Sequence, residues 1–169
     1  MVAEETVKLI GNRGSVVIVT ESFEATKSPN AESQVRGFKS GQTKVSGVQL
    51  REVREVKRPM AEDAQNWPKG YASRFVNMGS GAEALVLFVN IPQTLSQEDI
   101  AALKASKSKL VFVSPTSSAI KPLLQEGVIH LAILNRFPPK PAPAGKESAR
   151  EWFERTYLIA KPGSLAELQ

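Results

Sequence analysis

The fold of this chain is decided between Ala84 and Leu134, where the sequence reads ALVLFVNIPQTLSQEDIAALKASKSKLVFVSPTSSAIKPLLQEGVIHLAIL. Three mostly apolar runs of strand length lie within it: Ala84–Ile91, Leu110–Val113 and Val128–Leu134. Continuous apolar runs are typical of strands that are covered on both faces, whereas half-exposed strands alternate between apolar and polar residues. This stretch therefore predicts three buried strands.

Two helices are expected in the connections between these runs. In the first connection, Leu95–Ser106, the side chain of Ser96 is a suitable N-cap, and Glu98 and Asp99 follow it in the first turn. The second connection, Ser117–Glu126, has the length of a short helix and is followed by a glycine. Strand, helix, strand, helix, strand is the pattern of a right-handed βαβαβ unit with a parallel sheet. The predicted fold class is α/β, with an antiparallel β-sandwich or jelly roll with short helices as the alternative.

The first half of the chain is expected to be β-rich. Val7–Ile10 and Val16–Thr20 are short β-branched runs, and the glycine-flanked segment Gly11–Gly14 between them is typical of a hairpin. Residues 24–42 are rich in Ser, Lys, Asn and Gly, which predicts an exposed, flexible loop. In Val45–Arg58 some apolar residues alternate with polar ones, whereas others recur every three residues as on one face of a helix. This segment therefore predicts a strand with a bent or helical end.

Two segments follow the last apolar run. Residues 136–146 are rich in proline, which predicts an extended surface spacer. Residues 147–160 predict a helix with a wide apolar face that includes Trp152 and Tyr157. Such a helix either covers its own sheet as a final layer or docks onto a neighbouring subunit. We expect residues 1–169 to form a single domain, because a chain of this length suits one core.

The composition of the chain indicates the cellular compartment in which it works. There is no cysteine, which excludes disulfides and thiolate chemistry and fits a reducing compartment. Glu4 and Glu5 occupy positions where a signal peptide would carry positive charge. The longest apolar run, Ala84–Val89, is too short to span a bilayer as a helix. A cytoplasmic protein without membrane contact is the expectation.

No catalytic motif stands out, so the question of an enzyme stays open and a non-enzymatic role is favoured. His130 is the only histidine, and it lies within an apolar run. A packed imidazole is favoured there over a catalytic one, since no second histidine or cysteine is available to complete a metal site. The nucleophile-elbow and phosphate-loop motifs are absent. We expect neither a metal nor a cofactor.

The residues after the second apolar run form one candidate ligand site. They precede a predicted helix, whose free N–H groups favour anions, although capping of that helix is the simpler role of the same hydroxyls. In a parallel sheet they would share the carboxyl edge with Asn90 and Asn135, where α/β proteins bind ligands. The candidate anion-binding residues are Ser114, Thr116, Ser117 and Ser118.

Charge points to a second candidate site. Between Lys27 and Arg58 there are eight basic and three acidic residues, and this excess of five equals the net charge of the whole chain, +5. Basic residues near aromatics such as Phe38 and Tyr71 can follow a phosphate backbone and stack a base, although a solvated face is the simpler interpretation. The candidate nucleic-acid-binding residues are Arg36, Lys39, Lys44, Arg51, Arg54, Lys57 and Arg58.

Three functions remain open on this basis. The leading hypothesis is a non-enzymatic basic protein that binds a polyanion, RNA or DNA. One alternative is a self-assembling, coat-like structural subunit. The expected partners of the chain are a nucleic acid and further copies of itself in a homo-oligomer. The other alternative is a small α/β ligand-binding domain, or an enzyme, that acts on a phosphate-containing small molecule.

Overall fold

The computed structural model describes residues 1–23, 29–45, 47–58, 66–114 and 119–163. Within these ranges one sheet of six strands has the order β2-β1-β3-β4-β5-β6. The first five strands are parallel, and β6 is antiparallel to β5. The strands are β1 (Gly14–Phe23), β2 (Val48–Arg58), β3 (Ala84–Phe88), β4 (Lys109–Ser114), β5 (Leu131–Asn135) and β6 (Tyr157–Ala160).

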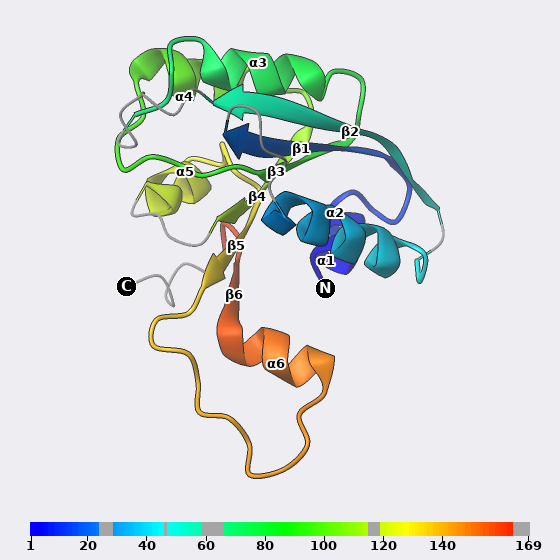
Figure 1. Cartoon of the computed structure of the whole chain (residues 1–169). Helices are drawn as coiled ribbons and strands as arrows, with labels where there is room; N and C mark the ends of the chain where they lie inside the picture. The colour runs from blue at the N-terminus through cyan, green and yellow to red at the C-terminus, as the bar shows by residue number, and fades with distance from the viewer. Residues whose placement is uncertain (24–28, 46, 59–65, 115–118, 164–169) are drawn as a thin grey trace.

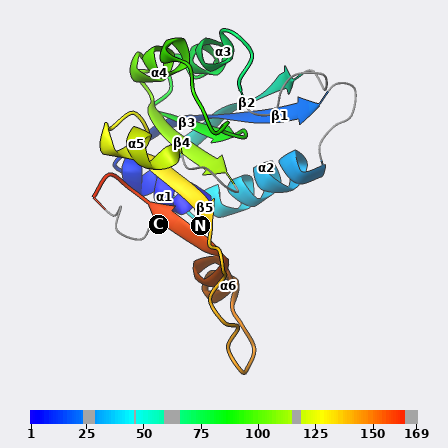
Figure 2. The ribbon, with the colours of Figure 1, turned by 90° about the vertical axis from the view of Figure 1, so that its left-hand side faces the viewer.

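Helices cover both faces of this sheet (Figures 1 and 2). Buried residues of α3, α4 and α5 pack on one face, and those of α1 and α2 pack on the other. The helices are α1 (Val2–Leu9), α2 (Pro29–Gln42), α3 (Tyr71–Met78), α4 (Gln97–Lys104), α5 (Ile120–Gln125) and α6 (Ala149–Thr156). The predicted α/β class is therefore confirmed, as is the parallel βαβαβ unit in the second half.

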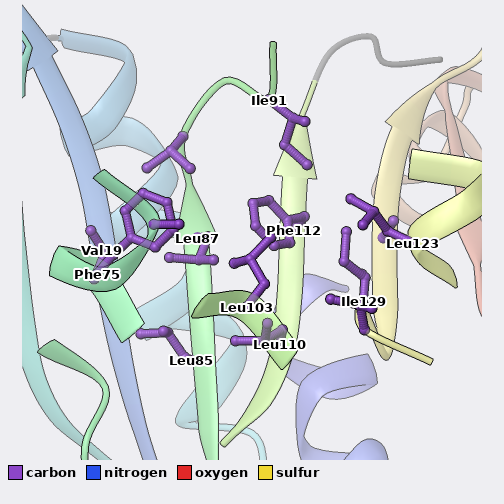
Figure 3. Packing of buried hydrophobic residues seen from close by; sticks show 14 of the residues in the cluster. Val19, Phe75, Leu85, Leu87, Ile91, Leu103, Leu110, Phe112, Leu123 and Ile129 are labelled. Carbon is purple, nitrogen blue, oxygen red and sulfur yellow. The ribbon is translucent and has the colours of Figure 1, made fainter. Parts of the chain in front are cut away.

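The core follows from the central position of β3. All five residues of β3 are buried, and successive side chains point to opposite faces of the sheet. Leu85 and Leu87 join the cluster beneath α3 and α4, where Figure 3 shows Leu87 near Phe75 and Phe112. Val86 belongs to the cluster on the opposite face. A strand buried on both faces must be apolar throughout, which explains why the sequence identified it.

The expected N-terminal hairpin is wrong. Val2–Leu9 is the helix α1, because Ala3 and Val7 lie one turn apart and are both buried against the sheet. The glycine-flanked segment does turn the chain, with φ of 72° at Gly11 and 61° at Asn12, but it joins a helix to β1. β1 then pairs in parallel with β2 and β3.

The expected loop over 24–42 is also wrong where the structure describes it, since Pro29–Gln42 forms α2. This helix is the crossover between the parallel strands β1 and β2. β2 stays a strand to its end at Arg58 instead of bending into a helix. Its register shifts opposite the Val16/Val17 step. The shift brings Leu50 and Val53 to the α2 face although they are three residues apart.

The last part of the chain departs from the sheet and returns to it. Residues 136–146 are mostly exposed, as expected of the proline-rich spacer. The predicted helix over 147–160 is shorter than expected: α6 ends at Thr156, and Tyr157–Ala160 is the edge strand β6. Figure 1 shows α6 beyond the end of β5 and β6, so it is not a covering layer. No helix in the described ranges is both long enough and apolar enough to cross a membrane.

The difference in burial between the centre and the edge of the sheet can be tested with a matched pair of valine-to-alanine substitutions, one at each place. We expect Val86→Ala to lower the free energy of unfolding by about 2–3 kcal/mol, because it leaves a cavity in a strand buried on both faces. Val53→Ala removes the same atoms from a residue that is 38% exposed on the edge strand, and we expect a loss of less than about 1 kcal/mol. Urea unfolding measures both, and equal losses would contradict the description of the core.

Candidate functional site

The parallel strands place their carboxyl ends along one edge of the sheet, which we call the carboxyl edge. The chain moves from β1 to β2 on one side and continues through β3, β4 and β5 on the other. The step between β1 and β3 is therefore the point at which the strand order reverses. Open α/β sheets bind ligands outside the carboxyl ends of their strands at such a point.

A buried polar network occupies this point. Glu21, near the end of β1, accepts a hydrogen bond of 2.9 Å at Oε1 from the hydroxyl of Tyr71. Its Oε2 accepts longer bonds of 3.4 Å from the backbone N and from Nδ2 of Asn90. Nη1 of Arg58 lies 3.6 Å from Oε1, and the Trp67 indole donates to the carbonyl oxygen of Asn90 at 2.8 Å. The network ties β1, β2 and α3 to the residues after β3.

These contacts give the network a structural role. The side chains of Glu21 and Arg58 are only 4% and 5% exposed, and their polar atoms are used within the chain. Burial raises the pKa of Tyr71, and the negative charge of Glu21 raises it further, so the hydroxyl keeps its proton and remains a donor. Asn90 is the exposed member of the network.

A groove opens at the carboxyl edge on the α1/α2 face of the sheet, with a volume of about 580 Å³. Strands, helix α2 and the α6 region each supply one wall. The aromatic groove, as we call it, is lined by Met1, Val2, Asn30, Ser33, Gln34, Gly37, Phe38, Phe88, Val113, Ile133, Asn135, Trp152, Phe153 and Tyr157. None of these side chains is that of an Asp, Glu, Lys or Arg.

The floor and the polar wall come from regular elements. Phe88 and Ile133 lie near the carboxyl ends of β3 and β5, where side chains on the α1/α2 face point into the groove. On α2, Asn30, Ser33 and Gln34 are spaced at three and four residues, so they share one face of the helix. This face presents amide and hydroxyl groups to the groove.

The third wall consists of three aromatic rings. The ring of Tyr157 lies 4.9 Å from that of Phe153 and 5.7 Å from that of Trp152, measured between centroids, and the second contact is edge-to-face. Phe153 is buried and anchors the group. Trp152 remains 45% exposed, so part of its indole is available for a ligand.

Polar contacts hold this wall in place. Residues 136–156 leave the sheet after β5 and return to it at β6, and we call them the excursion. At its base, Nε of Arg136 donates to the backbone oxygens of Glu154 and Tyr157 at 3.2 and 3.1 Å. Across the excursion, Arg155 donates to both carboxylate oxygens of Glu147 at 2.6 and 3.1 Å. This contact with Arg155 lowers the pKa of Glu147. The aromatic rings are therefore positioned before any ligand arrives.

The predicted anion-binding loop is only partly covered by the structure. Thr116, Ser117 and Ser118 lie outside the described residues, and Ser114 is the last residue of β4. Asn90 and Asn135 do follow β3 and end β5 at the carboxyl edge, as expected, and Asn135 lines the aromatic groove. The role of the loop stays a prediction.

The basic segment does not form one surface. Arg58 is buried beside Glu21, and Nη1 and Nη2 of Arg51 donate to the carbonyl oxygens of Gly81 and Ser80. Lys44 follows α2, and Lys57 is exposed on β2. Only three of the predicted residues are brought together, in a second groove between α2 and β2: Arg36, Lys39 and Arg54.

His130 lies just before β5. Its Nδ1 accepts a hydrogen bond of 3.2 Å from the backbone N–H of Leu110. Burial, and to a smaller degree the nearby charge of Lys109, lowers its pKa. Because this position is at the amino end of β5, away from the carboxyl edge, a packed imidazole fits better than a catalytic one.

Comparison with known proteins places the fold. No family model and no curated protein matches the sequence. An arabinose-binding protein from Geobacillus stearothermophilus has 15% identity and a TM-score of 0.59 over 99% of this chain and 60% of its own. A solute-binding protein from Burkholderia graminis in complex with D-arabinose has 12% identity and a TM-score of 0.59 over 97% and 58%. One from Bacillus halodurans with bound myo-inositol has 17% identity and a TM-score of 0.55 over 78% and 43%.

These similarities and the contacts above correct two expectations. The nucleic-acid partner predicted from charge is wrong: the similar structures are sugar-binding solute-binding proteins, and Arg51 and Arg58 are engaged within the chain. The expected coat-like homo-oligomer is corrected on the same grounds, since none of these similar proteins is a structural subunit. The chain spans 43–60% of their lengths.

The buried network predicts a large effect of removing one carboxylate. We expect Glu21→Ala to lower the free energy of unfolding by about 3–5 kcal/mol, because Arg58 and Tyr71 lose a buried partner. Glu126→Ala is the matched control, since it breaks the half-exposed pair with Lys104 and should cost less than about 1 kcal/mol. If chemical denaturation gave similar losses for both variants, the structural role of the network would be refuted.

His130 allows a pH test, because it is the only histidine. Its lowered pKa means that the folded state favours the neutral imidazole, which stabilises the fold above the ordinary pKa of about 6.5. This contribution is lost as the pH falls through the lowered value. We expect His130→Asn to flatten the fall in unfolding free energy between about pH 7 and 5. Unchanged pH dependence in urea titrations of the variant would contradict the assignment.

Proposed function

We propose that this chain binds a small, neutral, polyhydroxylated molecule of the monosaccharide or cyclic polyol class in the aromatic groove. The observation that carries the proposal is the lining of the groove, which combines exposed aromatic surface with amides and, among the described residues, has no charged side chain. Charged residues make up 23% of the chain, yet none of the described residues places a charged side chain in this groove. An ionic ligand would lose its hydration there without a charged side chain to compensate.

The dimensions of the groove suit a ligand of this size. Its volume of about 580 Å³ falls within the range of roughly 300–1,000 Å³ that is usual for small-molecule sites. A sugar ring has one face of C–H groups, which can pack on the exposed indole of Trp152. Because the rings of Phe153 and Tyr157 already support that indole, little conformational entropy is lost on binding.

The polar wall supplies the complementary contacts. The side-chain amides of Asn30, Gln34 and Asn135 each offer both donors and acceptors, and a hydroxyl group likewise donates and accepts. These residues approach from α2 on one side and from β5 on the other, so they can bond hydroxyls at different edges of one ring. Specificity for a particular sugar would follow from which hydroxyls reach an amide.

The similar structures support this choice of ligand. The neighbours named above bind arabinose or myo-inositol, and a further similar structure, from Actinobacillus succinogenes, holds D-allose with 14% identity and a TM-score of 0.55. Since this chain spans only part of their lengths, the proposal concerns ligand binding alone.

The proposal is tested by calorimetric titration with myo-inositol, D-arabinose and D-allose. We expect saturable binding of at least one of them, and Trp152→Ala should weaken it about tenfold or more, the size of an aromatic stacking contact of about 1.4 kcal/mol. Phe137→Ala is the matched control, because Phe137 is 98% exposed on the same excursion and does not line the groove. Equal weakening by both variants, or no binding at all, would refute the proposal.

Gly37 offers a test that does not depend on removing an aromatic ring. A Cβ at this position in α2 meets no atom within 4 Å, and the residue lines the groove. We expect Gly37→Leu to fill part of the groove and abolish binding while unfolding free energy stays equal or rises by about 1 kcal/mol, because leucine is the better helix former. If the variant were stable and bound the ligand normally, the binding site could not be the aromatic groove.

A further inference from the structure

A second groove lies on the other side of α2, between this helix and the edge strand β2, with a volume of about 500 Å³. Figure 1 shows α2 next to the part of the sheet that β1 and β2 form. The basic groove, as we call it, is lined by Thr20, Ala31, Glu32, Val35, Arg36, Lys39, Val53, Arg54 and Glu55. It differs from the aromatic groove in having both an apolar floor and several charges.

The floor of the basic groove is aliphatic. Ala31 and Val35 lie one turn apart on α2, and Val53 on β2 is 38% exposed, which makes it one of the few large apolar side chains left open to solvent in the described ranges. The size of this aliphatic patch suits a short branched hydrocarbon body.

The positively charged side chains around this floor have few partners among the described residues. Within the described residues, no hydrogen bond or ion pair joins the side chain of Arg36 or of Lys39 to a protein group. Arg54 donates through Nη2 to Glu52 at 2.8 Å, but its Nε is buried and has no acceptor among those residues. The Arg54 side chain as a whole is 40% exposed and lines the groove, so its guanidinium can face a ligand there.

The anions in the lining restrict the kind of ligand. Glu32 and Glu55 line the same groove, so the described residues supply three cationic and two anionic side chains and leave a small positive balance. A polyanion would be repelled by the two carboxylates, whereas a single carboxylate can be placed against Arg54 and one further cation.

We propose that the basic groove binds a small organic monoanion, with a carboxylate that pairs with the guanidinium of Arg54 and a short branched aliphatic body on Ala31, Val35 and Val53. Arg36 or Lys39 neutralises the remaining charge of the carboxylate. This site lies apart from the aromatic groove, and its ligand class is different, so it stands whether or not a sugar binds there. Because residues of α2 line both grooves, the two sites share one helix.

The probe for the test is isovalerate, followed by amide chemical shifts or calorimetry on the whole chain. We expect saturable binding of isovalerate, with much weaker binding of 3-methylbutan-1-ol, which lacks the charge, and of sulfate, which lacks the body. Arg54→Gln should weaken isovalerate binding about tenfold or more, the size of one charged hydrogen bond. Lys39→Gln is a second variant on an exposed helix position, for which a weakening of about threefold is expected from the loss of one partly screened charge.

Lys57→Gln is the matched control, since it removes the same charge from the same strand without lining the groove. We expect it to change the affinity for isovalerate less than twofold. Equal losses for Lys57→Gln and Arg54→Gln, or equal binding of sulfate and isovalerate, would show only a diffuse charge effect and overturn the proposal. Trp152→Ala should leave isovalerate binding unchanged, so failure of the sugar site and failure of this site are told apart.

Discussion

A carboxylate placed inside a protein is tolerable only if donors surround it, and the carboxyl edge of this sheet is organised around that constraint at Glu21. A cation comes from β2 (Arg58, 3.6 Å away), and hydrogen bonds come from α3 (Tyr71) and from Asn90, two residues after β3. Satisfying one carboxylate therefore fixes the relative positions of three strands and a helix at the point where ligands bind in such sheets. The described hydrogen bonds use both carboxylate oxygens of Glu21 within the chain, and the two proposed ligand sites lie in grooves that this carboxylate does not line.

How far the sequence predicts the fold depends on where each segment is buried. β3, β4 and β5 were identified because strands covered on both faces must be apolar at nearly every position. α4 was identified from Ser96 as a suitable N-cap and from Glu98 and Asp99 in the first turn. In the structure Ser96 and Asp99 form a capping box, in which each side chain bonds the other's backbone. α2 was missed because only Val35 and Phe38 among its larger side chains are apolar. Much of its inner surface lines grooves instead of a core, so the helical pattern that burial imposes is absent.

The site was harder to predict than the fold, because its walls are far apart in the chain. Asn30 on α2 and Trp152 on α6 meet only because β6 returns antiparallel to β5 and brings the aromatic residues back to the carboxyl edge. The width of the apolar face that includes Trp152 and Tyr157 was visible in the sequence. A local pattern shows that such a face needs a partner, but it does not show whether the partner is a core, a subunit or a groove.

The net positive charge of the chain has a physical explanation that requires no polyanion. Arg58 neutralises a buried carboxylate, and Arg51 satisfies two carbonyl oxygens at the turn before β3. The cations that remain around α2 share their groove with Glu32 and Glu55. Charge summed along a sequence therefore overstates the field at any one surface, because burial and pairing remove part of it and the rest is spread over separate elements, such as Lys57 on β2 and Arg36 and Lys39 on α2. The side of α2 that lines the aromatic groove presents uncharged side chains, so a small neutral molecule can bind there without giving up the hydration of an ionic group.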